Sequence, residues 1–333
     1  MRRVAILFFT DRGAETALRL TGGLEGDWTV ERYRPSGNLK ELTAELFARV
    51  EALIFVGACG VAVRAIAPLV ASKRSDPAVV VLDEKGEYAI SLLSGHIGGA
   101  NALTRAVASV TGGAAVITTA TDVNRRFSVD AWAAANGLWI SDMGAAKRFA
   151  AEILRRDLPL SSDFPISGSL PPGVYAGETG ELGVAISCRS VAPFDETLLL
   201  VPRRLHLGIG CRRGTPVEKL RAAVEAALEA AGVEAEALKC AASIDVKCDE
   251  AGLHKLCKEL NLPLRFYSAE ELMAVEGDFE PSEFVRKTVG VDNVCERSAV
   301  RSAGKNARLL VHKQRMDGVT VAIAQEDWSV SFE

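Results

Sequence analysis

The sequence predicts an α/β protein made of two three-layer α/β/α domains. The N-terminal domain is expected to have a mostly parallel sheet, and the smaller C-terminal domain a mixed sheet. Short, almost continuously apolar segments alternate with amphipathic segments, which is typical of buried strands connected by helices. The chain has 333 residues, which is long for one hydrophobic core and sufficient for two. Hydrophobic residues make up 48% of the chain and charged residues 25%, as in folded globular proteins.

The N-terminal domain is predicted over residues 1–122. Its strands are the apolar segments Val4–Phe9, Leu53–Val56, Ala78–Leu82, Tyr88–Leu92 and Ala115–Thr118. Between them, helical patterns cover Leu39–Val50 and Ile97–Val110. The following segment, 123–201, is expected to pack on this domain. It has helical patterns at Ser128–Asn136 and Gly144–Leu154. A loop rich in Pro, Gly and Ser follows at 161–173, and two strands come last, at Leu182–Ser187 and Thr197–Val201.

The C-terminal domain is predicted over residues 202–333. Its first strand, Leu205–Ile209, leads through a glycine-containing loop into a helix that ends at Gly232. Two helix starts have the pattern of a capping box, Thr215 with Glu218 and Ser268 with Glu271. A second helix is predicted at Glu250–Leu260, and the remaining strands at Lys239–Ile244, Leu264–Phe266, Leu309–Lys313 and Val319–Ala324.

Charge and composition restrict the classes of partner. The net charge of −4 and the pI near 5.8 argue against a protein that binds nucleic acids or membrane surfaces in general. The first apolar segment is too short for a signal peptide, and the longest, Ala52–Val70, is interrupted by glycines, Arg64 and Pro68. The 7 cysteines form no CxxC pair, and none of the 4 histidines lies near another in sequence. We therefore expect a cytoplasmic protein with reduced thiols and no zinc site, in which a metal centre would have to rely on carboxylates.

The loop Ser94-Gly95-His96-Ile97-Gly98-Gly99 is the most informative local feature, because a strand precedes it and a helix is predicted to follow at once. Glycines allow a tight turn, and the N–H groups at a helix start can hold a carboxylate, a phosphate or a developing oxyanion. His96 could act there as an acid or base near neutral pH. The alternative is structural: Ser94 caps the helix and His96 binds a nearby carbonyl group.

Two further polar turns follow predicted strands of the N-terminal domain. Gly57 and Gly60 precede Arg64, which could hold an acidic substrate group or could be an ordinary solvated helix residue. Thr118 and Thr119 with Asp122 bring hydroxyls and a carboxylate to a strand end. Ligands of open α/β sheets bind beyond the carboxyl ends of the strands. If the sheet is parallel, these turns and the loop at 94–99 converge.

The C-terminal domain repeats the pattern of a strand, a glycine loop and a helix. Gly208 and Gly210 precede Arg212 and Arg213, which could bind an anion or could form a solvated basic loop. Ser243, Lys247 and Glu250 cluster near another strand end. Glu296 and Lys313 are further candidates, although such residues are more commonly ordinary helix or strand charges. The chain has no Walker A pattern, no complete GxGxxG and no GxSxG, which argues weakly against ATP or NAD and against a serine hydrolase triad.

Taken together, these motifs resemble the cobalt-precorrin-5A hydrolase family of the anaerobic cobalamin pathway. The resemblance runs nearly end to end and is weakest from about 140 to 200. In the first half it is carried by Gly57–Arg64, Ile66–Pro68, Lys73, Asp76–Val79, Asp83-Glu84, Leu92–Asn101 and Thr118–Asp122. In the second half it is carried by Leu207–Arg213, Ala242–Asp245, Lys247, Glu250 and Val291–Glu296.

The resemblance implies a reaction in which water opens a lactone on a cobalt-bearing macrocycle and acetaldehyde is then lost. Such chemistry needs a base, oxyanion donors and cationic groups for the carboxylates of the substrate. The expected catalytic residues are His96, Asp122 and Glu296, with oxyanion donors at the N–H groups of Gly95, Gly98 and Gly99. The expected substrate-binding residues are Gly57, Gly60, Arg64, Lys73, Ser94, Gly95, Gly98, Gly99, Asn101, Thr118, Thr119, Gly208, Gly210, Arg212, Arg213, Ser243 and Lys247.

The expected partner is an anionic cobalt corrinoid, which brings the cobalt with it, so that no separate cofactor is implied. A homodimer and transfer contacts with neighbouring cobalamin-pathway methyltransferases are further hypotheses, whereas nucleic acids and membranes are not expected. Two other functions stay open. One is a non-catalytic tetrapyrrole carrier of the same pathway, and the other is an unrelated enzyme that binds phosphate or nucleotide.

Overall fold

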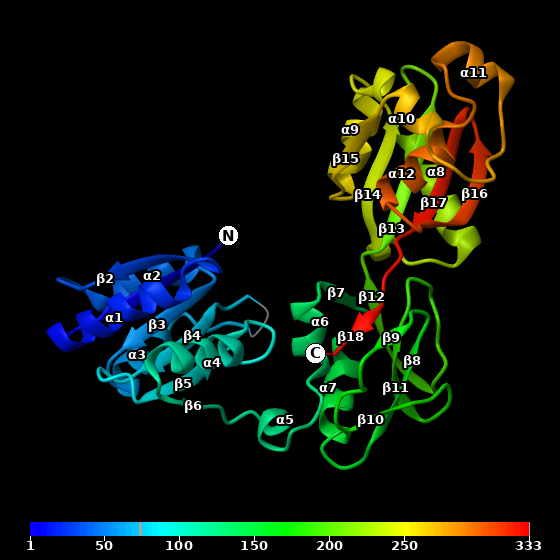
Figure 1. Ribbon diagram of the computed structural model, residues 1–333. Coiled ribbons are helices and arrows are strands. Elements are labelled where there is room, and N and C mark those ends of the chain that lie inside the picture. The colour runs from blue at the N-terminus through cyan, green and yellow to red at the C-terminus, as the bar shows by residue number, and fades with distance from the viewer. Residues whose placement is uncertain (73–74, 333) are drawn as a thin grey trace. The chain divides into compact units, whose positions relative to one another are not determined.

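A computed structural model describes residues 1–72 and 75–332 (Figure 1). The expected substrate-binding residue Lys73 lies outside the described residues. Contacts divide the chain into two compact units, Met1–Ala135 and Asn136–Glu333, and each unit is described here by itself. Within the described residues no helix combines the length and the apolarity that crossing a bilayer requires.

Unit 1 is built on a six-stranded sheet with the order β2-β1-β3-β4-β5-β6. The strands are β1 Arg2–Phe8, β2 Trp28–Tyr33, β3 Ala52–Val56, β4 Ala78–Leu82, β5 Tyr88–Leu93 and β6 Ala114–Val116. All neighbouring strands are parallel except β4 and β5, which are antiparallel. The predicted mostly parallel sheet is therefore confirmed, but its last two strands run opposite to the first four.

Helices cover both faces of this sheet, because its strands are apolar on both sides. Ile54 and Val56 pack with helices α1 Asp11–Leu24 and α4 Ala100–Thr111, whereas Leu53 and Phe55 pack with α2 Leu39–Arg49 and α3 Cys59–Ile66. Alternate residues of β3 thus enter two separate cores, as the period of a strand requires. Two short helices, α5 Ala120–Val123 and α6 Val129–Ala135, end the unit. This part of the fold is the expected three-layer arrangement.

Unit 2 begins with a five-stranded sheet of order β10-β8-β11-β12-β7. Its strands are β7 Leu138–Ile140, β8 Leu158–Ser162, β10 Val174–Ala176, β11 Leu182–Ile186 and β12 Glu196–Pro202, and helix α7 spans Met143–Glu152. Strand β9 Ile166–Ser167 pairs with β18 Val330–Ser331 near the end of the chain. The segment predicted as a loop at 161–173 therefore contains the end of β8 and all of β9.

The last sheet of unit 2 is mixed, as predicted, with the order β15-β14-β13-β17-β16. Strands β13 Leu205–Cys211, β14 Leu238–Ile244 and β15 Leu264–Tyr267 are parallel, and β17 Val319–Gln325 is antiparallel to both β13 and β16 Arg308–Met316. The helices are α8 Val217–Ala231, α9 Ala251–Glu259, α10 Ala269–Met273, α11 Glu283–Val289 and α12 Val294–Ala303. Helix α8 contacts α9, and α10 contacts α12. The predicted domain limits at 122 and 201 stay predictions.

The two expected capping boxes have different outcomes. At α10 the Ser268 hydroxyl accepts from the Glu271 N–H, and the Glu271 carboxylate accepts from the Ser268 N–H, so this box is confirmed. At α8 the expected box is wrong, because the Thr215 hydroxyl donates to the carbonyl oxygen of Arg212 at 2.7 Å and the helix begins only at Val217. The Thr215 hydroxyl therefore closes the preceding loop instead of capping the helix.

Candidate functional site

The loop after β5, residues 94–99, is not part of the helix that follows it. Ser94 and Gly99 both adopt left-handed backbone conformations, with φ of 57° and 85°, and α4 starts only at Ala100. The predicted start at Ile97 is therefore wrong by about one turn. A Cβ atom on Gly98 would lie 2.3 Å from the Cβ of Ser94, so this position requires glycine. The Gly99 N–H donates to the carbonyl oxygen of His96 at 2.9 Å, which engages one of the three expected oxyanion donors.

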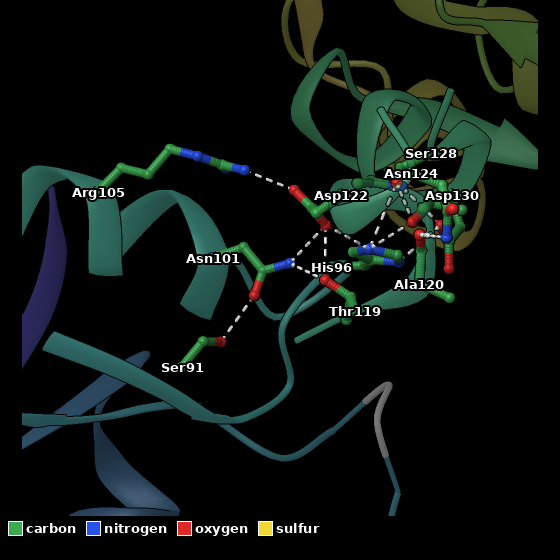
Figure 2. A network of polar contacts seen from close by, with 12 residues as sticks. Ser91, His96, Asn101, Arg105, Thr119, Ala120, Asp122, Asn124, Ser128 and Asp130 are labelled. Carbon is green, nitrogen blue, oxygen red and sulfur yellow. Dashed lines mark hydrogen bonds and ion pairs between the residues drawn. The ribbon is translucent and has the colours of Figure 1, made fainter. Parts of the chain in front are cut away.

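The His96 ring lies between two carboxylates (Figure 2). Its Nε2 is 3.1 Å from Oδ2 of Asp122, and its Nδ1 is 3.3 Å from Oδ1 of Asp130. The hydroxyl oxygens of Thr121 and Ser128 lie 3.2 and 3.3 Å from the same Nε2. Loop 94–99 is thereby tied to α5, to α6 and to the turn between them. The imidazole does not simply bind a carbonyl group, as the structural alternative proposed.

The two carboxylates change the protonation of this centre. The hydrogen bond to Asp130 raises the pKa of His96 above its ordinary value of 6.5, although burial opposes it, and Asp122 adds to the increase. For Asp122, burial acts to raise the pKa, but the hydrogen bonds from Thr119, Arg105 and His96 outweigh it and the pKa falls below 3.8. Both shifts favour an imidazolium ion beside an ionised carboxylate.

Asp122 is the point where the rest of the network meets. Its Oδ2 accepts hydrogen bonds from Asn101 Nδ2 at 2.9 Å and from the Thr119 hydroxyl at 2.6 Å, and its Oδ1 pairs with Arg105. Asn101 also donates to the Thr119 hydroxyl oxygen at 2.9 Å and accepts from the Ser91 hydroxyl at 2.7 Å (Figure 2). The structure thus brings together the expected residues His96, Asn101, Thr119 and Asp122, whereas the Thr118 residue is exposed beside them.

The turn at 57–64 does not join this centre, which corrects the expected convergence of three turns. Strand β5 is antiparallel to β4, so the carboxyl ends of β5 and β6 lie at the edge of the sheet opposite to the carboxyl end of β3. Accordingly, the Gly57 N–H donates to the carbonyl of Leu82, at the end of β4, whereas the Ser94 hydroxyl donates to the carbonyl of Asp76, before β4 begins. Gly60 and the exposed Arg64 lie on α3 at the far edge.

Unit 2 has a pocket of about 740 Å³ at the carboxyl ends of β13 and β14. Four of the expected substrate-binding residues line it, namely Gly210, Arg212, Arg213 and Lys247, together with Lys313 and Arg315. Five basic side chains but only two acidic ones, Asp292 and Asp317, face this space. Its volume lies within the range of small-molecule sites in proteins. Its place at the strand ends is where ligands of α/β sheets bind.

Two expected residues of unit 2 serve the fold beneath this pocket instead. A Cβ on Gly208 would lie 1.8 Å from the carbonyl oxygen of Cys295, so the absence of a side chain lets α12 pack directly on β13. The Ser243 hydroxyl is fully buried and donates to the carbonyl of Ile209 at 2.7 Å. Neither residue contributes to the pocket lining.

Glu296 is also fully buried, and its carboxylate is saturated by hydrogen bonds. It accepts from the N–H groups of Glu280 and Lys313, each at 2.9 Å, and from the side chain of Asn293. His312 Nδ1 lies 3.2 Å from Oε1 of the same carboxylate. These contacts join the start of α12 to β16 and to the segment before α11, which favours a structural role over the expected catalytic one.

The sequence did not point to several residues of the His96 network and of the pocket in unit 2. Asp130 and Arg105 lie on helices, where an isolated charged residue is commonly solvated, and only the turn at 124–128 brings Asp130 to His96. The apolar residues of α11 near the pocket gave no signal either, because the segment is short and mostly polar. Asp130 carried one detectable signal, since it lies between Val129 and Ala131 in an otherwise apolar segment.

Three of the cysteines are buried and unreactive. All 7 are free, and no group of three or more His, Cys, Asp and Glu side chains within the described residues is placed to hold a metal ion. Burial raises the pKa of the Cys188, Cys257 and Cys295 thiols to about 12, so these three are unreactive near neutral pH.

Comparisons with known proteins lead to one biosynthetic pathway. Residues 41–122 match the family described as Cobalamin synthesis G N-terminal, and residues 205–324 match Cobalamin synthesis G C-terminus. A cobalt-precorrin-5A hydrolase from Salmonella typhimurium is 38% identical, over 96% of this chain and 97% of that protein. A protein of the same name from Priestia megaterium is 31% identical, over 87% of this chain and 82% of that protein. The solved structure of CobE, a protein from the cobalamin (vitamin B12) biosynthetic pathway, is 36% identical and covers 38% of this chain and 92% of that chain, with a TM-score of 0.36.

Proposed function

The chain belongs to the cobalt-precorrin-5A hydrolase family, and on that basis we propose that it hydrolyses cobalt-precorrin-5A, releasing acetaldehyde and giving cobalt-precorrin-5B. The observation that carries the proposal is the 38% identity to a curated hydrolase over 96% of the chain. The excess of basic side chains in the pocket of unit 2 supports it, because the substrate carries several carboxylates. In this proposal cobalt enters as part of the substrate, and the protein supplies no cofactor.

The overall reaction consumes one water molecule and releases one molecule of acetaldehyde. Water adds to the lactone carbonyl carbon and releases both of its protons to the solvent, and the bond from that carbon to the ring oxygen breaks. A general acid protonates this oxygen, so that a carboxylate and a hydroxyl group result. The hydroxyl then loses its proton while a carbon–carbon bond breaks. The oxygen becomes the carbonyl oxygen of acetaldehyde, and the electron pair of the broken bond passes to the macrocycle.

His96 fits both proton steps at the substrate oxygen. Its raised pKa and its two carboxylate neighbours favour the imidazolium ion, which can give a proton to the oxygen that leaves the lactone. The resulting neutral imidazole can take the same proton back when the hydroxyl becomes acetaldehyde. Asp122 and Asp130 hold the ring and stabilise its charged form. The N–H groups of Gly95 and Gly98 remain as the proposed oxyanion donors, since that of Gly99 is engaged.

The direct test is anaerobic incubation of the protein with cobalt-precorrin-5A and measurement of acetaldehyde. We expect acetaldehyde and the contracted corrinoid in equal amounts. We also expect the His96→Gln variant to lose a factor of about 100 or more in kcat, the usual contribution of a positioned acid–base group. Binding of the substrate without acetaldehyde would instead identify a carrier, and a rate near that of the wild type in His96→Gln would remove this residue from the mechanism.

A further inference from the structure

The pocket of unit 2 contains an unusual concentration of exposed apolar surface. Phe284 on α11 is 78% exposed, Val246 after β14 is 49% exposed, and Met316 at the end of β16 is 43% exposed, and all three line the pocket. Figure 1 labels α11 at the end of the sheet where β13 and β14 finish. A contiguous apolar surface bordered by charged residues marks a binding site for a partly apolar ligand.

The basic residues of the pocket are incompletely neutralised. Arg213 pairs with Asp249, and Lys247 lies 3.5 Å from Glu250. Lys313 Nζ, however, donates to the backbone carbonyl of Glu280 at 3.0 Å, which leaves its charge uncompensated. Within the described residues Arg212 has no carboxylate partner at all. Asp292, one of the two acidic residues, is engaged by Arg297 outside the pocket at 2.8 Å. Two cations are thus available to an anionic ligand.

We infer that this pocket binds the macrocycle in its free-acid form, with the flat ring against Phe284 and Met316 and the side-chain carboxylates on Arg212 and Lys313. The inference rests on the proposed function, and it adds which surface receives the substrate and which property of the substrate is recognised. An aromatic ring stacks on a flat conjugated ligand, and basic groups select carboxylates over neutral amides. A corrinoid whose side chains are amidated therefore binds poorly.

The binding test uses the full-length protein and two stable corrinoids. Cobyrinic acid has free carboxylates, and cobinamide is its largely amidated counterpart. Titration calorimetry should show that cobyrinic acid binds at least about tenfold more tightly than cobinamide, a difference of roughly 1.4 kcal/mol. Raising the salt concentration should weaken the binding of cobyrinic acid far more than that of cobinamide, because salt screens the charge pairs.

Three variants locate the site. We expect Phe284→Ala and the double variant Arg212→Glu, Lys313→Glu each to weaken the binding of cobyrinic acid by about tenfold or more. The matched control Lys255→Glu reverses an exposed charge on α9 outside the pocket lining and should change the affinity by less than about twofold. Melting temperatures close to that of the wild type would show that the variants fold, as the exposure of Phe284 and Arg212 predicts.

Two results would overturn the site assignment: affinities in the pocket variants within about twofold of the wild type, or equal affinities for cobyrinic acid and cobinamide. The acetaldehyde assay separates this failure from a failure of the proposed function. If the wild type releases acetaldehyde and the pocket variants keep its KM, the enzyme is confirmed but the pocket is wrong. If the pocket variants lose binding and no form of the protein releases acetaldehyde, the pocket is confirmed and the hydrolase function is wrong.

Discussion

At the scale of single residues, the structure changes the expected role of His96. A histidine in a glycine loop was expected as a base, but a free base needs an unoccupied ring nitrogen. Here Nδ1 faces Asp130 and Nε2 faces Asp122, Thr121 and Ser128. Both carboxylates favour the imidazolium form, so we expect His96 to act first as an acid and to become a base only after the first proton transfer. Local sequence could suggest that His96 titrates, but not which form prevails, because Asp130 is 34 positions away and reaches the ring only through the fold.

The Asp130→Asn variant tests this assignment through pH. Because Asp130 is the largest cause of the raised imidazole pKa, its loss should lower the pKa of His96, which NMR can follow in a protein with only 4 histidines. If the imidazolium form acts first, the rate falls as pH rises through this pKa. The fall should then occur at lower pH in the variant than in the wild type. The N-cap variant Asp142→Asn on α7 is the control and should leave both curves in place.

Glu296 provides a second test at this scale. Because its buried carboxylate accepts from two backbone N–H groups and from Asn293, Glu296→Gln places an amide group against donors. We expect the free energy of unfolding to fall by about 3 kcal/mol, measured by denaturant unfolding. The kcat per folded molecule should stay near the wild-type value. A normal stability with a lost kcat would restore the catalytic role that the sequence suggested.

At the scale of elements, strand direction separates what the sequence could predict from what it could not. Five of the six strands of unit 1 were predicted within a few residues, because their apolar segments stand out in the sequence. The edge strand β2 was missed, because it is mostly polar and only partly buried. The directions of the predicted strands were assumed to be parallel, and this misplaced the turn at 57–64. A signal was available: only residues 83–87 connect β4 to β5, whereas a parallel crossover needs a dozen or more. The start of α4 was not predictable in the same way, since it depends on the left-handed Ser94 and Gly99.

Gly208 tests the packing of one element on another. Because a Cβ at this position would overlap the Cys295 carbonyl at 1.8 Å, Gly208→Ala should push α12 away from β13 and lower the free energy of unfolding by about 3 kcal/mol. The comparison variant is Gly22→Ala on α1, where no atom of the described residues lies within 4 Å of the new Cβ. That variant should be neutral or stabilising by up to about 1 kcal/mol. Equal thermal stability of the two variants would contradict this account of the packing.

At the scale of the whole molecule, the two units carry different parts of the proposed function. The His96 network belongs entirely to Met1–Ala135, and every residue that lines the basic pocket belongs to Asn136–Glu333. The sequence pointed to the glycine turn that carries Arg212 and Arg213, and both arginines line the pocket. It did not indicate Phe284 or Met316, because a single apolar residue in a polar segment does not predict a binding surface. Only the fold shows that the two residues line the same pocket.

This division predicts that binding can be separated from catalysis. A fragment that begins at Asn136 contains the complete pocket, and it should bind cobyrinic acid within about threefold of the affinity of the full chain, measured by calorimetry. The same fragment should release no acetaldehyde, because it lacks His96. A folded fragment that binds more than about tenfold more weakly would show that unit 1 contributes to the affinity.

The central claim is hydrolysis, in which water opens the lactone before acetaldehyde leaves. Its most direct test is turnover of cobalt-precorrin-5A in water enriched in the heavy isotope of oxygen, followed by mass spectrometry of the corrinoid product. The account predicts one heavy oxygen in the new carboxylate for each acetaldehyde released. Release of acetaldehyde with no solvent oxygen in the corrinoid, or binding of the substrate with no acetaldehyde, would contradict it.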